Sequence, residues 1–427
     1  MKYLQRRSRP VGVDLFAGAD GLSLGFEQAG FDIAAAVEID PIHCATHEFN
    51  FPNSTAICAS VTDLTAEAIR RRASLEGVDI DVVFGGAPCQ GFSMMGKRAL
   101  DDPRNQLVGH YVRLVRELQP KYCVFENVKG LTLGKHVKFL EELIETLAQS
   151  GYRVLLPYQV LNAADFGVPQ DRRRLFLMAA RGDMSLPAYP EQVSKRVTVR
   201  EAIGDLPDAD DFDALLDSDA VATRWITRSA YAKRLRGTAV DVTDFSYSRN
   251  FDKNFLTSSL RTVHNQVSRQ RFLATGVGEA EPVSRFHKLD PAGVCNTLRA
   301  GTDSARGAFT SPRPIHPSLP RVITVREAAR LHSYPDWFRF HMTKWHGFRQ
   351  IGNSVPPLLA RAVAGEIMKA LGKVPSKPAL ILTPGHPELL TYDMGAAARR
   401  FHIPRNVIAQ RTRKTVDESF EPELAYA

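Results

Sequence analysis

The sequence predicts an α/β fold, with a doubly wound, Rossmann-like sheet and a second, smaller domain. Strand-length apolar segments alternate with helix-length segments from residue 11 to about residue 178. Glycines or polar side chains follow the predicted strands, as is typical where parallel strands end at a ligand site. Between about residues 187 and 320 this regularity fades. A chain of 427 residues with 44% hydrophobic content is long enough for two domains.

Composition narrows the class of protein. There is no apolar run of about twenty residues and no signal-like amino terminus, so we expect a soluble cytoplasmic protein without membrane contact. Five cysteines without C-x-x-C spacing predict neither a disulfide framework nor a metal site. A formal net charge of +8 is compatible with a polyanionic partner such as nucleic acid.

The first predicted unit is a strand from Val11, a glycine turn that reaches Gly21, and a helix through Ala29. Such a unit directs backbone N–H groups and a helix amino end at a ligand, but the turn fits nicotinamide, flavin and adenosyl cofactors alike. The next strand, residues 33–37, ends at Glu38. A carboxylate about twenty residues beyond the glycines can accept hydrogen bonds from ribose hydroxyls. A simple acidic cap at a strand end is the alternative.

A candidate nucleophile follows the fourth predicted strand. A third strand, residues 56–63, and a helix at 66–73 precede the apolar run 82–84, which ends in two glycines. Pro88 then fixes the approach of the chain to Cys89, whose thiol would lie where open α/β sheets place their chemistry. A lone cysteine is more often a small buried apolar residue. The polar, basic segment after it, residues 94–105, predicts a mobile loop that closes over a substrate.

Further polar groups are expected at the same edge. A helix at 107–118 leads to a strand at 122–125 that ends in Glu126, next to the Cys89 strand. After a helix at 137–150 and a strand at 153–160, a turn rich in Gln and Arg directly precedes the apolar run 175–178. The apolar run would pull these arginines against a buried strand, which favours a functional role over a solvated charged face.

The carboxyl-terminal half contains fewer regular patterns. Capping boxes starting at Thr198 and Thr324 bracket the irregular region. The segment 349–357 opens an amphipathic helix predicted at 358–371. In the tail, a short helix, a tight turn at 402–404 and a second helix ending near residue 414 outline a basic helix-turn-helix. The simpler alternative is a basic extension packed on the catalytic domain.

Five motifs, taken in this order, resemble those of the cytosine-carbon-5 DNA methyltransferases that use S-adenosylmethionine. They are the glycine turn at 14–21, the run 86–90, Glu126-Asn127-Val128, Gln170-x-Arg172-x-Arg174, and Gly352-Asn353-Ser354-Val355. The resemblance covers most of residues 11–371. It implies a Rossmann-like methyltransferase sheet formed by residues 1–190 and 323–372, a target recognition domain at 191–322, and a basic extension at 373–427.

The resemblance also implies the site. Cys89 would add to carbon 6 of cytosine and so make carbon 5 nucleophilic. Glu126 would hold or share a proton at ring nitrogen 3, with burial raising its pKa. The catalytic set is Cys89, Glu126, Arg172 and Arg174, with Arg174 at the carbonyl oxygen of the base. Gln90, Ser93, Asn127 and Gln170 form the substrate-binding set, although Gln170 and Arg172 are also expected to brace the site.

The implied cofactor is S-adenosylmethionine, with S-adenosylhomocysteine as its product. Two positions depart from the family pattern: Asp20 stands where most members have glycine, and Ser60 where many have an aspartate that faces the adenine amino group. Asp20 could clash with the donor's carboxylate, and the change at Ser60 removes a hydrogen bond worth about 1–2 kcal/mol. The expected cofactor-binding residues are Phe16, Gly18, Gly21, Leu22, Glu38, Ile39, Ser60, Val61, Pro88, Asn353 and Ser354.

The expected function is methylation of a flipped cytosine in a specific double-stranded DNA sequence by a monomeric enzyme. A cognate restriction endonuclease acting separately is a possible partner. Two alternatives remain: an RNA cytosine-5 methyltransferase, and a DNA-binding homologue with impaired catalysis, for which Asp20 is the suspicious feature. The long separate region favours DNA, because reading base edges in a groove requires added elements.

Overall fold

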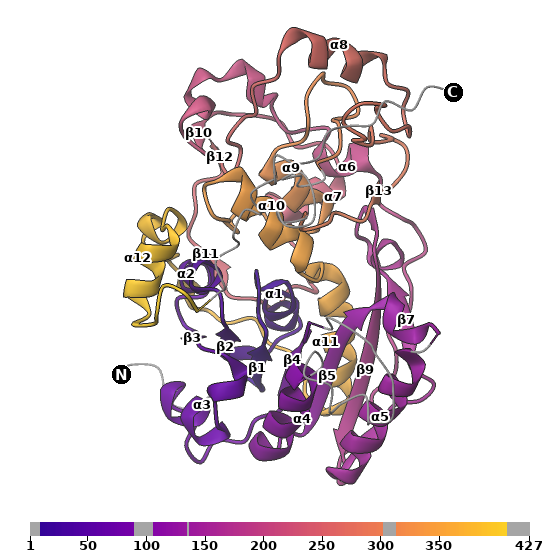
Figure 1. Cartoon of the computed structure of the whole chain (residues 1–427), viewed down its shortest axis with the longest axis vertical. Helices are drawn as coiled ribbons and strands as arrows, with labels where there is room; N and C mark the ends of the chain where they lie inside the picture. Colours follow the sequence, from indigo (N-terminus) through magenta and orange to yellow (C-terminus); the bar gives the residue numbers. More distant parts are fainter. Residues whose placement is uncertain (1–8, 89–105, 135, 302–312, 408–427) are drawn as a thin grey trace, which may run out of the picture.

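The computed structural model describes residues 9–88, 106–134, 136–301 and 313–407. Its central feature is an eight-stranded sheet of order β3-β2-β1-β4-β5-β9-β6, in which β7 also pairs with β9 (Figure 1). The first five strands of this order are parallel, whereas β6 and β7 run antiparallel to β9, and β9 antiparallel to β5. The strands are β1 (Val11–Leu15), β2 (Asp32–Glu38), β3 (Thr55–Cys58), β4 (Val82–Gly85), β5 (Tyr122–Val128), β6 (Tyr152–Val154), β7 (Gln159–Asn162) and β9 (Arg173–Arg181).

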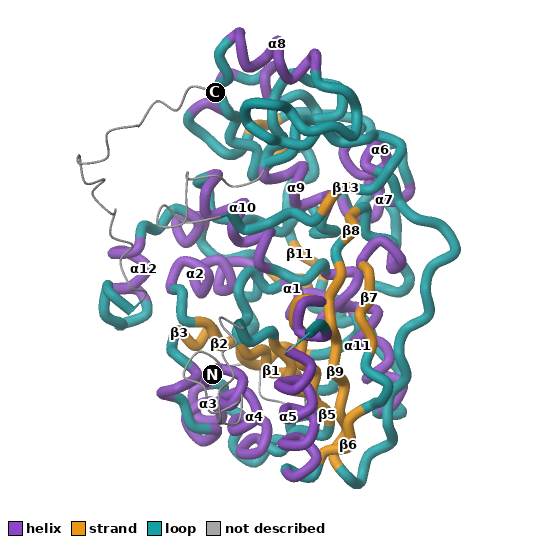
Figure 2. Tube along the Cα trace, turned by 45° about the vertical axis from the view of Figure 1, so that its right-hand side comes forward, coloured by secondary structure: helices purple, strands orange, loops and turns teal. Residues whose placement is uncertain are grey.

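Helices cover both faces of this sheet, because neighbouring apolar residues of a strand point to opposite sides. Val82 and Phe84 of β4 belong to one buried cluster, and Val83 belongs to another. The first cluster contains α1 (Gly21–Gln28) and α11 (Pro357–Ala370), and the second contains α3 (Ala66–Arg72), α4 (Gln106–Leu118) and α5 (His136–Gln149) (Figure 2). The predicted doubly wound α/β fold is therefore confirmed.

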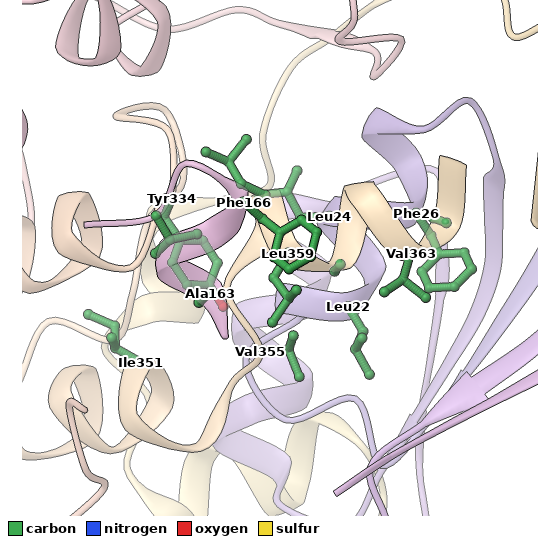
Figure 3. Close-up of a cluster of buried hydrophobic side chains, with 14 of the residues drawn as sticks. Leu22, Leu24, Phe26, Ala163, Phe166, Tyr334, Ile351, Val355, Leu359 and Val363 are labelled. Atoms are coloured by element: carbon green, nitrogen blue, oxygen red, sulfur yellow. The ribbon is translucent and has the colours of Figure 1, made fainter. Parts of the chain in front are cut away.

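The packing of α1 on α11 forms the centre of the first cluster. Leu22, Leu24 and Phe26 of α1 lie beside Leu359 and Val363 of α11 (Figure 3). The two helices approach closely at one glycine. A Cβ atom on Gly25 would lie 2.3 Å from the Cβ of Ala360 and 2.7 Å from the backbone nitrogen of Arg361. A side chain at this position would therefore push the helices apart.

Local details differ from the sequence predictions in places. The strand predicted at 153–160 is divided into β6 and β7, and Pro157 between them has no N–H to donate to a neighbouring strand. The strand predicted at 56–63 ends at Cys58, and a 3-10 helix, η1 (Val61–Asp63), follows. The segment expected to open the last large helix instead forms the final turn of α10 (Lys344–Asn353), separated from α11 by residues 354–356.

Most of the region between residues 199 and 300 lies in the upper half of Figure 1, whereas residues 248–249 lie lower, close to α2. Both predicted capping boxes are present, at Thr198 on α6 and at Thr324 on α9. The region also contacts the sheet domain, since Arg249 forms a buried ion pair with Glu27 of α1 at 2.8 Å. Its elements, with the helix that follows, are α6 (Val199–Ile203), β10 (Val221–Ala222), α7 (Ala230–Leu235), β11 (Ser248–Arg249), β12 (Phe255–Leu256), α8 (Gln266–Ala274), β13 (Cys295–Asn296) and α9 (Val325–Leu331).

The chain beyond α11 returns along the sheet domain. It forms β14 (Ile381–Leu382), a 3-10 helix η9 (Pro387–Leu390) and α12 (Met394–Arg400), and α12 lies against α2 (Pro41–Asn50) (Figures 1 and 2). The first helix of the predicted helix-turn-helix is thus present, and His402 forms the expected turn with φ 55°. Residues 404–407 are not helical, and the rest of the predicted second helix lies outside the described residues. Within the described ranges, no helix has the length and hydrophobicity that a membrane span requires.

Two glycine substitutions test the helix packing in opposite directions. Gly25→Ala should lower the free energy of unfolding by about 2 kcal/mol, because the added methyl group meets backbone atoms of α11. Gly365→Ala, in the interior of α11, adds a methyl group that has no other atom within 4 Å. It should raise the free energy of unfolding by about 0.5–1 kcal/mol, because alanine has a higher helix propensity than glycine. Urea unfolding of both variants measures the difference. Equal stabilities would contradict the close approach.

Candidate active site

A cavity of ≈ 720 Å³ opens at the carboxyl edge of the parallel strands. Strands β1, β2, β4 and β5 all contribute residues at or just after their carboxyl ends, where such sheets bind ligands. Most of the predicted site residues that the structure describes meet here. They are Phe16, Gly18, Glu38, Ile39, Ser60, Val61, Pro88, Glu126, Asn127, Arg172, Arg174 and Asn353.

Glu38 is fixed at the end of β2 by backbone donors. Its Oε2 accepts a hydrogen bond from the N–H of Gly18 at 2.8 Å, and its Oε1 accepts from the N–H groups of Ile39 and Asp40 at 2.9 Å. The glycine turn before α1 is therefore tied to the end of the neighbouring strand. Carboxylate oxygens retain further acceptor capacity, so Glu38 can also bind hydroxyl groups from the cavity.

Glu126 and Arg174 form the charged centre of the cavity. The Nε of Arg174 lies 3.0 Å from Oε1 of Glu126, and both side chains are largely buried. The pairing of β5 with β9, with Val128 opposite Arg174, brings them together. Gly86 leaves space for the carboxylate, since a Cβ there would lie 2.5 Å from Oε2. Burial raises the pKa of Glu126, and the opposing charges of Arg174 and Arg172 do not fully offset this effect.

Asn127 connects the two strands that carry the site. Its Nδ2 donates to the carbonyl oxygen of Ala87 at 3.0 Å, and its Oδ1 accepts from the N–H of Val128 at 2.9 Å. Strands β4 and β5 are neighbours, as predicted. This bond fixes the turn through Pro88 that leads to Cys89. Cys89, Gln90 and Ser93, with the predicted loop 94–105, lie outside the described residues.

Arg172 and Gln170 brace the site from behind. Arg172 is 1% exposed, and its guanidinium donates to the carbonyl oxygens of Leu298, Gly352 and Ser354, each at 2.8 Å. The side chain of Gln170 donates to the carbonyl oxygen of Leu331 and accepts from the N–H of Leu298. These contacts support the bracing role for both residues, and Arg172 acts on the site through the segments that it holds.

Three residues expected at the cofactor do not line the cavity. Gly21 packs against the backbone, since a Cβ there would lie 1.9 Å from the carbonyl oxygen of Val355. Leu22 lies in the buried cluster between α1 and α11. The hydroxyl of Ser354 donates to the carbonyl oxygen of Ile351, which closes the last turn of α10. Each of these three residues therefore packs against other parts of the protein beside the cavity.

At both positions that depart from the family pattern, the side chain bonds to a group of the protein. Asp20 adopts a left-handed conformation, with φ 60°, and its carboxylate lies 2.6 Å from Nδ1 of His47. Asp20 is not among the cavity residues, so its carboxylate faces away from a ligand there. Ser60 does line the cavity, but its hydroxyl bonds to the hydroxyl of Thr62 at 2.7 Å and caps η1.

Other cavity residues were missed from the sequence. Asp40 accepts from the N–H of Ile42 as the cap of α2, a role that the Asp-Pro pair could have indicated. Arg349 of α10 lies 3.6 Å from Asp40, and His43 and Val407 also line the cavity. No local pattern marks these last three residues. Across the described chain, His, Cys, Asp and Glu side chains form no group of three that could hold a metal ion.

The comparisons with known proteins agree with this geometry. A family model described as C-5 cytosine-specific DNA methylase matches residues 11–369. Type II methyltransferase M.XorII of Xanthomonas oryzae pv. oryzae is 64% identical over 406 residues, which cover 95% of this chain and 96% of the relative. Type II methyltransferase M1.HphI of Haemophilus parahaemolyticus is 36% identical over 376 residues, covering 86% and 89%.

Solved structures give the same fold. The crystal structure of a prophage-encoded protein of E. coli, described as a DNA modification methyltransferase, matches with a TM-score of 0.70 and 34% identity, over 85% of this chain and 100% of that chain. The predicted fold and reaction class are confirmed, and the relatives favour DNA over RNA and an enzyme over an inactive binding protein. The chain therefore belongs to the C-5 cytosine-specific DNA methylase family and is an enzyme that methylates carbon 5 of cytosine in DNA.

Proposed function

We propose that this enzyme transfers a methyl group from S-adenosylmethionine to a cytosine flipped out of a specific duplex sequence, with Cys89 as its nucleophile and S-adenosylhomocysteine as the product. The observation that carries the proposal is the buried pair of Glu126 and Arg174, which faces the cavity beside the turn that leads to Cys89. The donor supplies a methyl group on a positively charged sulfur. All other functions are assigned to side chains of the chain itself.

The cavity fits such a donor. Glu38 is held by three backbone N–H groups and is assigned to the ribose hydroxyls. Ile39 and Val61 supply apolar walls for the adenine, while Phe16, Gly18 and Pro88 border the amino-acid and methyl ends. Asp20 faces His47, so the donor's carboxylate does not meet it. Asn353 completes the wall from the last turn of α10.

The base is bound from the β5 and β9 side of the same cavity. The thiolate of Cys89 adds to carbon 6, and the electrons displaced from the ring double bonds place charge at ring nitrogen 3. After carbon 5 has taken the methyl group, loss of its proton restores the double bond and expels Cys89 from carbon 6. Glu126 is assigned to that nitrogen, because its raised pKa favours a carboxyl group that can hold a proton. Arg174 is assigned to the carbonyl oxygen of the base. Asn127 positions the turn before the nucleophile, and Gln90 and Ser93 are proposed to contact the base.

The wider context follows from the relatives, which are Type II methyltransferases. We assign this chain to the same setting, as a monomer acting on double-stranded DNA beside a separate cognate endonuclease. The region from about residue 191 to residue 322 would read the sequence, because base edges are reached through elements added to the catalytic fold.

The nucleophile can be tested by substitution. Cys89→Ser should abolish methyl transfer and leave S-adenosylhomocysteine binding within about twofold of the parent, because a hydroxyl at its ordinary pKa cannot add to carbon 6.

Duplexes that carry 5-fluorocytosine should trap the parent protein covalently, which a denaturing gel detects. Bisulfite sequencing of DNA from expressing cells identifies the target sequence. A serine variant within tenfold of the parent rate would exclude Cys89 as the nucleophile.

The role of Glu126 predicts a pH dependence. Since burial raises the pKa of Glu126 above the ordinary value of about 4.3, the group keeps its proton at higher pH, and the methyl-transfer rate should fall as pH rises through that raised pKa. Glu126→Gln should reduce the rate by about 10²–10⁴-fold. It should also remove the fall of the rate with rising pH, because an amide does not titrate. Glu67→Gln, at an exposed site on α3, is the control. If the rate of Glu126→Gln falls with rising pH as in the parent, the titrating group is not Glu126.

A further inference from the structure

The C-terminal extension, residues 373–407, lies beyond the part of the chain that matches the family model. It leaves α11 at Gly372 and adds β14 in parallel to β11. At Gly385 its backbone comes close to the end of α2, where the N–H of Gly385 donates to the carbonyl oxygen of Phe49 at 2.8 Å. A Cβ on Gly385 would lie 3.0 Å from the Cα of Phe49. The extension therefore reaches α2 through a close backbone contact.

The extension then covers the outer side of α2. Leu389 and Leu390 are buried against Ala45 and Phe49 of α2, and Phe401 packs at the edge of this cluster. Hydrogen bonds to its carbonyl oxygens fix the extension to the segment before α10. The N–H of Met342 donates to the carbonyl oxygen of Leu390 at 2.9 Å. The Nε2 atom of His341 lies 3.0 Å from the carbonyl oxygen of Tyr392. The contact is thus a continuous packed interface.

Charge and turn geometry direct the end of the extension back to the cavity. Arg400, at the end of α12, forms an ion pair with Glu48 of α2. The left-handed turn at His402 ends the helix, and the N–H of Ile403 donates to the carbonyl oxygen of Ala398 at 3.0 Å. Five residues after this turn, Val407 lies in the wall of the same cavity as Glu38.

Helix α2 links this interface to the proposed donor site. Its cap, Asp40, follows two residues after Glu38 and donates its own N–H to that carboxylate. Asp40 and His43 line the cavity, whereas Ala45 and Phe49 further along the helix contact the extension. A displacement of α2 would therefore move the N–H group of Asp40, which is one of the three backbone donors that hold Glu38.

We propose that the C-terminal extension is a wall of the methyl-donor site, in which Val407 contacts the donor directly and the packing of η9 and α12 positions α2. This inference rests on the proposed function, because it assigns the cavity to S-adenosylmethionine. It gives α12 a role other than gripping DNA, since Arg400 is engaged with Glu48 and both Ala397 and Ala398 are buried. Val407 is apolar and half-buried, so it offers contact surface to a ligand.

The test measures binding of S-adenosylhomocysteine by calorimetry without DNA, on the full chain. Val407→Asp should weaken binding by about tenfold, because it replaces apolar contact by a carboxylate that the ligand would desolvate. Val374→Asp, at a 92% exposed site in the same extension, should bind like the parent. In steady-state assays, Val407→Asp should raise KM for the donor and leave kcat and KM for DNA unchanged.

Each outcome has one interpretation. A parent protein that does not bind S-adenosylhomocysteine would overturn the proposed donor site itself. A parent that binds, with Val407→Asp within twofold of it, would overturn only the inference about the extension. That inference is also overturned if Val407→Asp binds the ligand normally but loses DNA affinity with a flatter salt dependence, as a DNA-gripping tail would. If Val407→Asp lowers the melting temperature, Val407→Ser is tested in its place. Weaker ligand binding than in the parent is expected, and binding equal to the parent would overturn the inference.

Discussion

The buried guanidinium of Arg172 is the constraint on which the site depends. It donates to the carbonyl oxygens of Leu298, Gly352 and Ser354, which lie 126, 180 and 182 residues away along the chain. Burial lowers the pKa of this group well below its ordinary value, so the cation is held at a cost that its three acceptors must offset. Arg174 follows two residues later on β9. The brace therefore also sets where Arg174 meets Glu126.

Buried charge pairs join the irregular region to the sheet domain in the same manner. Arg249 lies 2.8 Å from Glu27 of α1, and Arg330 of α9 donates to Asp205, which follows α6. Such pairs add little net stability compared with apolar packing, but removing one partner is costly because it leaves an uncompensated buried charge. Directional contacts of this kind fix how the irregular region is oriented against the rest of the chain.

The sequence predicted what local pattern determines, and it did not predict what depends on distant contacts. The strand end at Glu38 could be placed, because a short apolar run there ends in a polar residue. The strand before Glu126 was also found, although β5 continues through Glu126 to Val128, because it pairs with β9 up to Arg174. The direction of the Asp20 side chain could not, since it depends on His47, 27 residues away. For the same reason Gly21 was assigned to a ligand, although its neighbours are atoms of Val355 and Tyr334. Nothing in the sequence around Val407 indicates that α12 and the turn after it bring the chain back to the cavity.

The contact between Asp20 and His47 also restricts how this chain can diverge. A non-glycine residue at φ 60° is disfavoured, and here its carboxylate is buried beside an imidazole that also contacts Ser54 at 2.9 Å. Replacing Asp20 by glycine would relax the backbone but leave the ring of His47 buried without its acceptor. Replacing His47 alone would leave a buried carboxylate without its partner. Positions 20 and 47 are therefore expected to be inherited as a pair, each making the other's substitution unfavourable.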